Sequence, residues 1–467
     1  MTAIGSHIKR ALPFAIAIGI WFTPVPAGLT LPAWHLFAVF IASIACVLLG
    51  SFPLLTASML AVGTVVLTET ITPAQAFSGF ANSSVLLVVI AFIVAQAVVK
   101  CGLGRRVSLL IVSRFGGSAL GLAYSIVLTD AAIAPAFPSN TARGGVLFPI
   151  VLSVCKGAGS EPDDEEGRRL GGYLMFCTMA SLAVSSALWM TATSANPIGV
   201  QIAEKAGVQI GFGTWLLASS VPSLIAIALL PLIVSKIFPP RVGATPEAPA
   251  AARKELAGMG SMSRDEWITL GTFALMVCGW VFGSKFNLNG TSVAFMGFGV
   301  LMVANVITLE DISKQGDTLA TFLWLAVLFA MSAQLNELGF MGYVGERLAE
   351  RMEGFAWPAL YVTLIGLYVG IHYLFVSQTS QLLALMAVFL DVGMRGGVPA
   401  PLMAYGLLFA SSYFSVITPQ GGSQNIIFVA AGYLKQAELY KMGLLITLAF
   451  MVVYVLIGTP WVLFVTR

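Results

Sequence analysis

Long apolar runs separated by short polar segments follow one another along the whole chain. A run of about 20 apolar residues is long enough to form a helix that crosses a bilayer. Eleven runs reach or approach that length, and we expect each of them to form a membrane helix. These runs are residues 11–29, 35–50, 53–69, 83–101, 170–190, 213–238, 266–283, 291–308, 316–336, 400–417 and 440–465.

Two further apolar stretches, 118–155 and 356–394, are interrupted near the middle by polar residues. The first interruption is Pro138-Ser139-Asn140-Thr141, and the second is Ser377-Gln378-Thr379-Ser380. Each half is too short to cross a bilayer comfortably, so the pattern predicts a hairpin that enters and leaves by the same face. Such re-entrant backbone is tolerated in a membrane only against protein or beside a wet cavity.

The two halves of the chain carry the same features in the same order. Gln96 lies 43 residues before Ser139, and Gln334 lies 43 residues before Ser377. An amphipathic stretch separates the glutamine from the hairpin in each half, and a second polar break follows each hairpin. The amphipathic stretches are 104–114 and 344–353. An odd number of crossings between the halves makes the predicted repeat inverted, as in secondary transporters that bind their substrate at the repeat interface.

The composition agrees with a polytopic membrane protein and excludes several other classes. Of the 467 residues, 58% are hydrophobic and 10% are charged, whereas soluble domains carry about 25% charged residues. The net charge of +3 lacks the basic excess of a nucleic-acid binder. The five cysteines and three histidines are scattered, so we expect neither a disulfide framework nor a metal cluster. The chain shows no Ser-His-Asp set, HExxH motif or Gly-rich phosphate loop, so we do not expect an enzyme.

Lysine and arginine are distributed unevenly among the polar loops. Loops 30–34, 70–82 and 207–212 contain neither, whereas the alternate segments hold most of them. The positive-inside rule therefore places the N-terminus and the open end of the first hairpin in the cytoplasm. The C-terminus and the open end of the second hairpin are predicted on the opposite side, where segment 337–355 is a partial exception to the rule.

The two hairpin tips carry hydroxyl and amide groups at the starts of half-helices. The first N–H groups of a helix have no intrahelical partners and carry partial positive charge, so they can bind a carboxylate. Two opposed tips could hold the two carboxylates of a short diacid. The alternative is that these residues only cap their helices. The predicted binding residues of the tips are Ser139, Asn140, Thr141, Ser377, Gln378 and Thr379.

The later polar breaks, 191–199 and 418–425, are expected to complete the site. Proline and glycine interrupt regular helix there and free backbone carbonyls. These carbonyls and nearby hydroxyls are hard oxygen donors that suit an alkali cation, although the prolines could also act only as kinks. We add Pro197, Thr418 and Pro419 to the predicted substrate site. A sodium site, if present, would use Ser139, Asn140, Thr193, Ser194, Ser377, Thr379 and Thr418.

At these motifs the chain resembles the divalent anion:sodium symporter family, also called INDY-type carriers. The resemblance covers nearly the whole chain and rests on both tips, on Thr418-Pro419 and on Gly432-Tyr433-Leu434. It implies a homodimer in which a transport domain carries dicarboxylates or tricarboxylates past a fixed scaffold domain by an elevator motion. Sodium-coupled members usually have Asn where this chain has Gln378. Together with Pro-Ser-Asn-Thr-Ala-Arg-Gly-Gly at 138–145, this makes the chain more similar to the exchanger branch, which includes chloroplast dicarboxylate translocators and bacterial citrate or tartrate:succinate antiporters.

Arg143 lies just inside the second arm of the first hairpin, at a depth where a charge is costly. Our hypothesis is that Arg143 supplies the positive charge that sodium supplies in symporters. Because a fixed charge cannot dissociate, the empty carrier would have to move an uncompensated charge, which favours obligatory exchange. The alternative is that Arg143 pairs structurally with a carboxylate such as Asp130.

The predicted fold is an all-α membrane protein with about eleven transmembrane helices, two re-entrant hairpins and an inverted repeat. The predicted function is the exchange of C4 and C5 dicarboxylates, such as malate, succinate, fumarate or 2-oxoglutarate. Alternatives are a sodium-coupled symporter of the same fold and an anion channel. We expect membrane lipid as a partner, no cofactor apart from the less favoured sodium, and a location in a bacterial inner membrane or the plastid inner envelope. The predicted parts are 1–82, N-terminal scaffold helices; 83–238, first repeat with hairpin 118–155; 239–265, cytoplasmic linker; 266–315, further scaffold helices; and 316–467, second repeat with hairpin 356–394.

Overall fold

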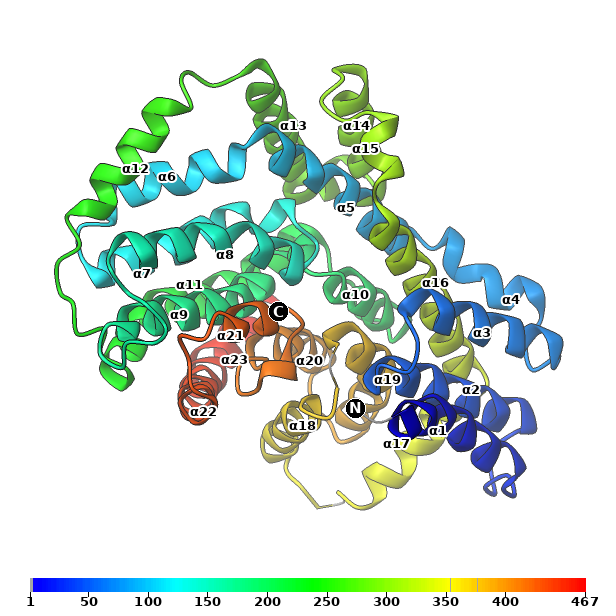
Figure 1. Ribbon diagram of the computed structural model, residues 1–467. Helices are drawn as coiled ribbons and strands as arrows, with labels where there is room; N and C mark the ends of the chain where they lie inside the picture. The colour runs from blue at the N-terminus through cyan, green and yellow to red at the C-terminus, as the bar shows by residue number, and fades with distance from the viewer. Residues whose placement is uncertain (1–2, 353, 376) are drawn as a thin grey trace.

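The computed structural model describes residues 3–352, 354–375 and 377–467, and these residues form helices and loops without a β-strand (Figure 1). Glu353, the last residue of a predicted amphipathic stretch, lies outside the described residues. The same is true of Val376, within the second predicted hairpin, and of residues 1–2. The prediction of an all-α fold is confirmed.

Each predicted membrane run contains a helix. The ends agree within a few residues for most runs, but α1 begins and ends seven or eight residues earlier than predicted, and the last run is divided into α22 and α23. The helices before the linker are α1 (Ala3–Phe22), α2 (Leu31–Leu48), α3 (Leu54–Leu67), α4 (Pro73–Phe77), α5 (Ser83–Cys101), α6 (Leu103–Phe115), α7 (Ala119–Ile133), α8 (Asn140–Gly157), α9 (Arg168–Leu188), α10 (Ala195–Lys205) and α11 (Phe212–Ile237). The later helices are α12 (Glu247–Gly258), α13 (Arg264–Phe282), α14 (Gly290–Val303), α15 (Leu309–Ser313), α16 (Gly316–Glu337), α17 (Phe340–Glu350), α18 (Trp357–His372), α19 (Gln378–Arg395), α20 (Ala400–Tyr413), α21 (Asn425–Ala430), α22 (Gln436–Val453) and α23 (Thr459–Val465).

Fewer helices than predicted meet the length and hydropathy expected of a membrane span. Within the described residues, seven helices are long and apolar enough, and α3, α14 and α18 are apolar but shorter. One of the seven is Ala119–Ala136, the first arm of the predicted hairpin 118–155. This arm therefore reaches the lower limit for a crossing. The argument that each arm of the hairpin is too short to cross a bilayer therefore fails for this arm. The re-entrant path itself stays a prediction.

The order of elements repeats between the halves, from α5 to α11 and from α16 to α22. In each half a long helix ends at a glycine in the left-handed region, Gly102 (φ 81°) or Gly339 (φ 84°). A β-carbon is disfavoured in that conformation, so glycine suits the sharp corner. The amphipathic helix α6 or α17 then begins at once, followed by the two arms of a hairpin. The predicted order of elements is thus present, and its inverted sense stays a prediction.

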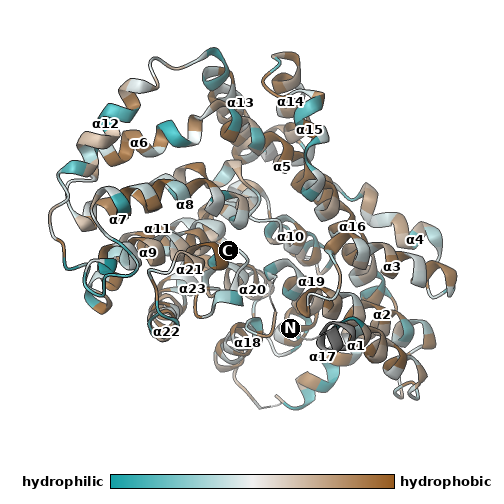
Figure 2. Ribbon diagram, viewed as in Figure 1, coloured by the Kyte–Doolittle hydropathy of each residue, from teal (hydrophilic) through white to brown (hydrophobic). Residues whose placement is uncertain are grey.

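The helix that follows each hairpin lies at the centre of the molecule. Nearly every residue of α9, and every residue of α20 from Leu402 to Tyr413, is buried, and the two helices pack together. A helix that is apolar all round must be enclosed by other elements. Figure 2 shows hydrophobic colouring along many of the helices and hydrophilic colouring at many helix ends and loops.

The predicted linker contains a helix, α12, which packs along α6. One end of the linker pairs with the chain before α7, where Ala119 N donates to Gly243 O and Thr245 Oγ1 donates to Gly116 O. Near the other end, Arg106 Nη1 donates to Gly260 O. The linker is therefore fixed to the first repeat along the length of α6.

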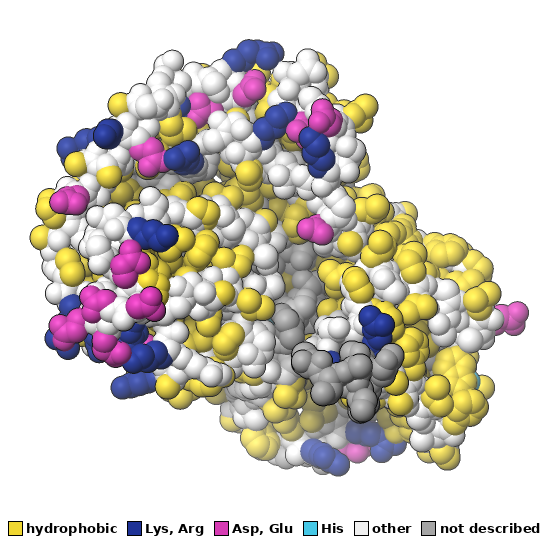
Figure 3. Space-filling view, in the orientation of Figure 1, with side chains coloured by type: hydrophobic (Ala, Val, Ile, Leu, Met, Phe, Trp, Pro, Cys, Tyr) yellow, Lys and Arg dark blue, Asp and Glu magenta, His cyan; other side chains and the backbone are white. Residues whose placement is uncertain are grey.

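Charged side chains and apolar side chains occupy different parts of the visible surface. In Figure 3, charged residues gather at the upper and left edges, over α6, α12 and the loop before α9, whereas the right side over α2–α4 is largely hydrophobic. A cavity of about 1040 Å³ lies between α6, α8 and the linker. A smaller cavity of about 250 Å³ lies between α10, α16, α17 and α19.

Candidate substrate site

The first hairpin tip is a short turn followed by a serine-capped helix. After α7, a 3₁₀ turn spans Ala134–Ala136, and Ser139 then caps α8. The Ser139 Oγ accepts a hydrogen bond from Ala142 N at 3.2 Å. The cap uses one of the four free N–H groups of the first helical turn, so others remain available to a ligand.

The second tip is built in the same way. Ser377 caps α19, and its Oγ accepts a hydrogen bond from Ser380 N at 3.3 Å. The capping alternative considered from the sequence is therefore observed at both tips. Capping and ligand binding are compatible here, because a single side-chain oxygen satisfies only part of a helix start.

The two tips meet in the middle of the molecule. Asn140 Nδ2 donates a hydrogen bond to Gln378 Oε1 at 3.2 Å, and both side chains are buried. These residues are separated by more than two hundred positions and come from different halves of the chain. The approach of the two tips that the diacid hypothesis requires is therefore present in the fold.

Each tip also contacts the polar break of the opposite half. The hydroxyls of Thr141 and Ser423 lie 2.6 Å apart, and those of Ser194 and Thr379 lie 3.0 Å apart. Thr141 and Ser423 are exposed, which leaves this side of the meeting point accessible. The fold thus brings all four polar segments into one cluster.

The other predicted residues lie on the same two breaks. Pro197 is buried in the first turn of α10, and Pro419 begins the 3₁₀ turn Pro419–Gly421. Thr193 and Thr418 both have extended backbone. Thr193 lies two residues before α10, and Thr418 lies directly before the turn Pro419–Gly421. All of the predicted binding residues lie in the tips or in the breaks that contact them. A direct role in binding stays a prediction for each of these residues.

Each break is held by an asparagine that lies within the predicted breaks 191–199 and 418–425 but was given no role there. Asn196 Nδ2 donates to Ser186 O and Trp189 O, at 2.7 and 3.1 Å. Asn425 Nδ2 donates to Ser415 O and Thr418 O, at 2.7 and 3.0 Å. The spacing to the acceptors is identical in the two halves. The shared Ser-x-Asn pattern in the two breaks was the signal that could have revealed these residues.

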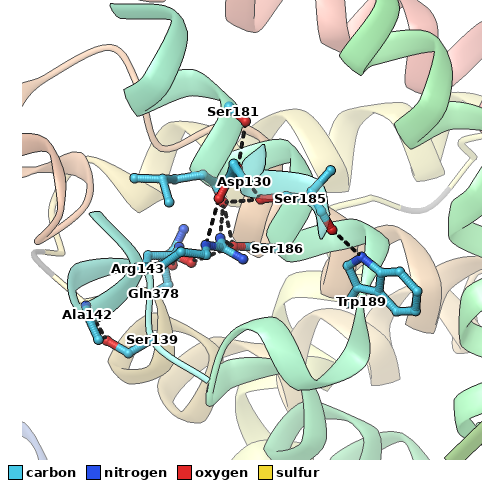
Figure 4. Close-up of polar contacts among 12 residues, drawn as sticks. Asp130, Ser139, Ala142, Arg143, Ser181, Ser185, Ser186, Trp189 and Gln378 are labelled. Atoms are coloured by element: carbon cyan, nitrogen blue, oxygen red, sulfur yellow. Dashed lines mark hydrogen bonds and ion pairs between the residues drawn. The ribbon is translucent and has the colours of Figure 1, made fainter. Parts of the chain in front are cut away.

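Arg143 is paired with Asp130 in the interior behind the first tip (Figure 4). The Arg143 Nε and Asp130 Oδ1 atoms are 2.9 Å apart, and both side chains are fully buried. Asp130 Oδ2 accepts hydrogen bonds from Ser181 and Ser185 at 2.6 and 2.7 Å. The structural pairing that was the alternative for Arg143 is therefore formed. Two serines one turn apart on α9, Ser181 and Ser185, were the missed signal for it.

The same guanidinium reaches the first tip. Arg143 Nη2 donates to Asn140 Oδ1 at 3.0 Å and also to Ser186 Oγ at 2.9 Å. The Asn140 oxygen is thereby occupied, which directs its Nδ2 toward Gln378. Arg143 is in this respect a positioning residue for the tip.

A network without an ion pair occupies the corresponding place behind the second tip. The His372 Nδ1 and Gln381 Oε1 atoms are 2.5 Å apart, and His372 Nε2 lies 2.6 Å from Gly421 O. Gln381 Nε2 donates to Tyr368 O at 2.8 Å. His372 is buried, and both of its ring nitrogens face acceptor oxygens, so a neutral imidazole donates to only one of them.

Several buried oxygens near the breaks have no hydrogen-bond partner within the described parts of the chain. They are Thr418 Oγ1, Asn196 Oδ1 and Asn425 Oδ1. Neutral oxygens of this kind fit the ligand chemistry of an alkali cation, so they are compatible with the predicted sodium site. The described residues contain no group of three or more His, Cys, Asp or Glu residues that could hold a transition metal.

A family model described as the sodium:sulfate symporter transmembrane region matches residues 5–466. The chain belongs to this family. Its members are transporters. The predicted resemblance to this family of carriers is therefore confirmed, and so is the prediction that the protein is a transporter and not an enzyme. Together with the seven apolar helices, membership of the sodium:sulfate symporter family identifies an integral membrane transporter.

Curated relatives in the family match over nearly the whole chain. Dicarboxylate transporter 2, chloroplastic, of Spinacia oleracea is 35% identical, with 96% of this chain and 81% of the relative covered. The citrate/succinate antiporter of Escherichia coli is 31% identical, with 98% and 99% covered. The solved structure of the Alcanivorax borkumensis YdaH transporter aligns with a TM-score of 0.59 at 15% identity, over 93% of this chain and 98% of that one. This last likeness concerns the fold alone.

Proposed function

We propose that this carrier exchanges C4 and C5 dicarboxylates across the membrane, with one carboxylate held at each hairpin tip. The contact between Asn140 and Gln378 carries this proposal, because it places two capped helix starts against each other. The printed names of the relatives, a dicarboxylate transporter and a citrate/succinate antiporter, support the same substrate class. Malate, succinate, fumarate and 2-oxoglutarate are the substrates to test first.

We further propose an elevator motion in a homodimer, with the repeats 83–238 and 316–467 inverted relative to each other. Residues 1–82 and 266–315 would supply the fixed scaffold. The N-terminus and linker would lie in the cytoplasm and the C-terminus outside, in a bacterial inner membrane or plastid inner envelope. The uneven distribution of loop lysine and arginine supports this orientation.

The hypothesis that Arg143 compensates substrate charge is separate from the exchange proposal. The ion pair with Asp130 counts against it, because a closed pair carries no net charge. Obligatory exchange can also arise if the empty tips are costly to move without a ligand. A sodium-coupled symporter is the second candidate, supported by the unpartnered oxygens of Thr418, Asn196 and Asn425.

The test is counterflow in proteoliposomes. Purified carrier is reconstituted with internal malate or succinate, and uptake of labelled dicarboxylate is measured without sodium. Exchange predicts uptake that requires an internal diacid. Uptake that needs a sodium gradient and no internal diacid would establish the symporter instead, and an electrical current without countertransport would indicate a channel.

A pair of variants tests whether the tips form the site. Thr141→Val and Thr379→Val remove the two hydroxyls that join each tip to the opposite break. We expect each to reduce exchange about tenfold. Thr64→Val is the matched control, because that exposed hydroxyl bonds only within its own helix. Equal activity in all three variants would show that substrate binds elsewhere.

A further inference from the structure

The cavity of about 1040 Å³ between α6, α8 and the linker is separate from the candidate substrate site. Its lining on α8 starts at Val146, and it includes none of the predicted binding residues. Ligand pockets in proteins commonly measure about 300–1,000 Å³, so the cavity is large enough for an organic ligand. The equivalent helices of the second half, α17 and α19, border a cavity of only about 250 Å³. The first cavity is larger because the linker, with α12, adds an outer wall.

The inner walls of this cavity are aliphatic. The side chains that α6 and α8 contribute to them include Leu109, Val112, Val146, Ile150 and Val154. On the same amphipathic helix α6, Leu110 and Phe115 are exposed, as expected of a helix that lies among lipids. Because apolar surface is stabilised when it is removed from water, walls of this kind in a membrane protein suit acyl chains better than water.

The exposed residues of the lining, which we call the rim, carry charges of both signs. Arg105 and Glu255 form an ion pair there. Lys156 and Glu247 also lie on the rim, and neither forms an ion pair with another described side chain. A free cation and a free anion beside an aliphatic cavity match a zwitterionic headgroup, with a phosphate at Lys156 and an ammonium at Glu247. An anionic headgroup would lack the second contact and would meet the Glu247 carboxylate.

We propose that this cavity binds a phospholipid of the surrounding membrane with a zwitterionic headgroup, of the phosphatidylethanolamine class. Its acyl chains pack between α6 and α8, Lys156 holds the phosphate, and Glu247 holds the ammonium. The orientation proposed above places Lys156 on the cytoplasmic side, where basic residues between helices meet lipid headgroups. The lipid contacts the helix that carries the first tip and so supports the first hairpin. This site is independent of whether the carrier works by exchange or by symport.

Two variants fill the cavity from opposite walls. Ala251→Phe adds a ring from α12, and Ser153→Phe adds one from α8. Both positions are exposed, so the larger side chain does not disturb the core. Ala250→Phe is the matched control, because Ala250 is exposed on the same helix α12 but does not line the cavity.

Two further variants test the headgroup. Lys156→Gln removes the contact to the phosphate, and Glu247→Gln removes the contact to the ammonium. A phosphate is common to all phospholipids, so Lys156→Gln should weaken every lipid. Glu247 alone distinguishes a zwitterionic headgroup from an anionic one.

The measurement is native mass spectrometry of the delipidated carrier in detergent, titrated with phosphatidylethanolamine or with phosphatidylglycerol of the same acyl chains. We expect Ala251→Phe and Ser153→Phe to bind phosphatidylethanolamine about tenfold more weakly than Ala250→Phe. The wild type should prefer phosphatidylethanolamine about tenfold over phosphatidylglycerol, and Glu247→Gln should abolish that preference. If one filling variant is not monodisperse, the other carries the test.

Two results would overturn the inference. Equal binding of phosphatidylethanolamine by the filling variants and Ala250→Phe would mean that the lipid adheres elsewhere on the membrane surface of the protein. A wild-type protein that binds phosphatidylglycerol as tightly as phosphatidylethanolamine would exclude a site for a zwitterionic headgroup. Neither result depends on transport, so the proposed function is tested separately.

Discussion

The two hairpin tips share a backbone design but differ in the chemistry behind them. Four residues after the capping serine, the first tip has Arg143 and the second has Gln381. Both side chains reach back to the preceding arm of the hairpin, to Asp130 in one case and to His372 and Tyr368 in the other. The second tip shows that this geometry can be built without an ion pair.

This difference bears on why the buried ion pair is present. Burying two charges is expensive, and neutral replacements of similar shape are often as stable. The network behind the second tip, which contains no ion pair, occupies the equivalent place within the same molecule. The ion pair is therefore better explained by the hydrogen bond from Arg143 that positions Asn140 than by a contribution to stability.

The strongest test of the comparison removes one charge. Asp130→Asn leaves Arg143 buried without a counter-charge, and we expect a loss of about 3–5 kcal/mol in stability. The double variant Asp130→Asn/Arg143→Gln leaves the first network without an ion pair, like the second, and should recover most of the loss. The measurement is the thermal midpoint and monodisperse yield in detergent. A single variant as stable as the wild type would show that the pair is not held as a closed unit.

A smaller effect is expected behind the second tip. His372→Phe removes the bonds to Gln381 and Gly421 and leaves neutral groups unpaired, which costs about 1–3 kcal/mol. The same thermal measurement compares it directly with Asp130→Asn. If His372→Phe lowered the thermal midpoint more than Asp130→Asn does, the expectation that disrupting the ion pair costs more would be wrong.

The contact between the tips offers a finer comparison. Gln378→Leu removes one neutral acceptor, whereas Asn140→Leu also removes the acceptor of Arg143 and Ser186. We expect Gln378→Leu to destabilise by about 1 kcal/mol and Asn140→Leu by more. Thermal midpoints of the two variants without substrate test this order, and equal losses would contradict it.

The smallest effect is expected at a surface ion pair, which serves as a reference for the buried one. Lys100 donates to Asp311 at 2.7 Å, and this hydrogen bond, with those from Thr308, lowers the pKa of Asp311 to about 2. The stabilisation is present above the ordinary pKa near 4 and is lost as the pH falls through about 2. Asp311→Asn should therefore cost less than about 1 kcal/mol at neutral pH. The difference from the wild type should shrink as the pH is lowered toward 3, and a difference that grew in acid would contradict the assignment.

Much of this arrangement could be predicted from the sequence, because polar residues inside apolar runs are informative by themselves. The tips, the later breaks and their order in both halves follow from such interruptions. The partners behind the tips could not be predicted, because the sequence does not show which face of α9 meets α7. Asp130 was considered only as a possible partner of Arg143, and Gln381 was not considered at all.

Local composition did not show the helix within the linker or the ends of the membrane helices. Residues 239–265 are rich in alanine, proline and charge, and Glu247–Gly258 within them is helical. Its helix is stabilised by contacts with α6, including an ion pair between Arg105 and Glu255, and these are invisible in local composition. Several apolar runs were counted as full spans because hydropathy alone does not show where a helix ends.

The attachment of the linker along α6 means that the covalent connection between the halves is not what keeps them together. Arg241, ahead of that attachment, is exposed and has a positive φ of 60°, which makes the peptide bond after it a natural site for trypsin. Cleavage there would leave α12 on the C-terminal fragment, where it would still pack against α6 of the N-terminal fragment. The two pieces should therefore co-purify in mild detergent, and genes for them should work when expressed separately.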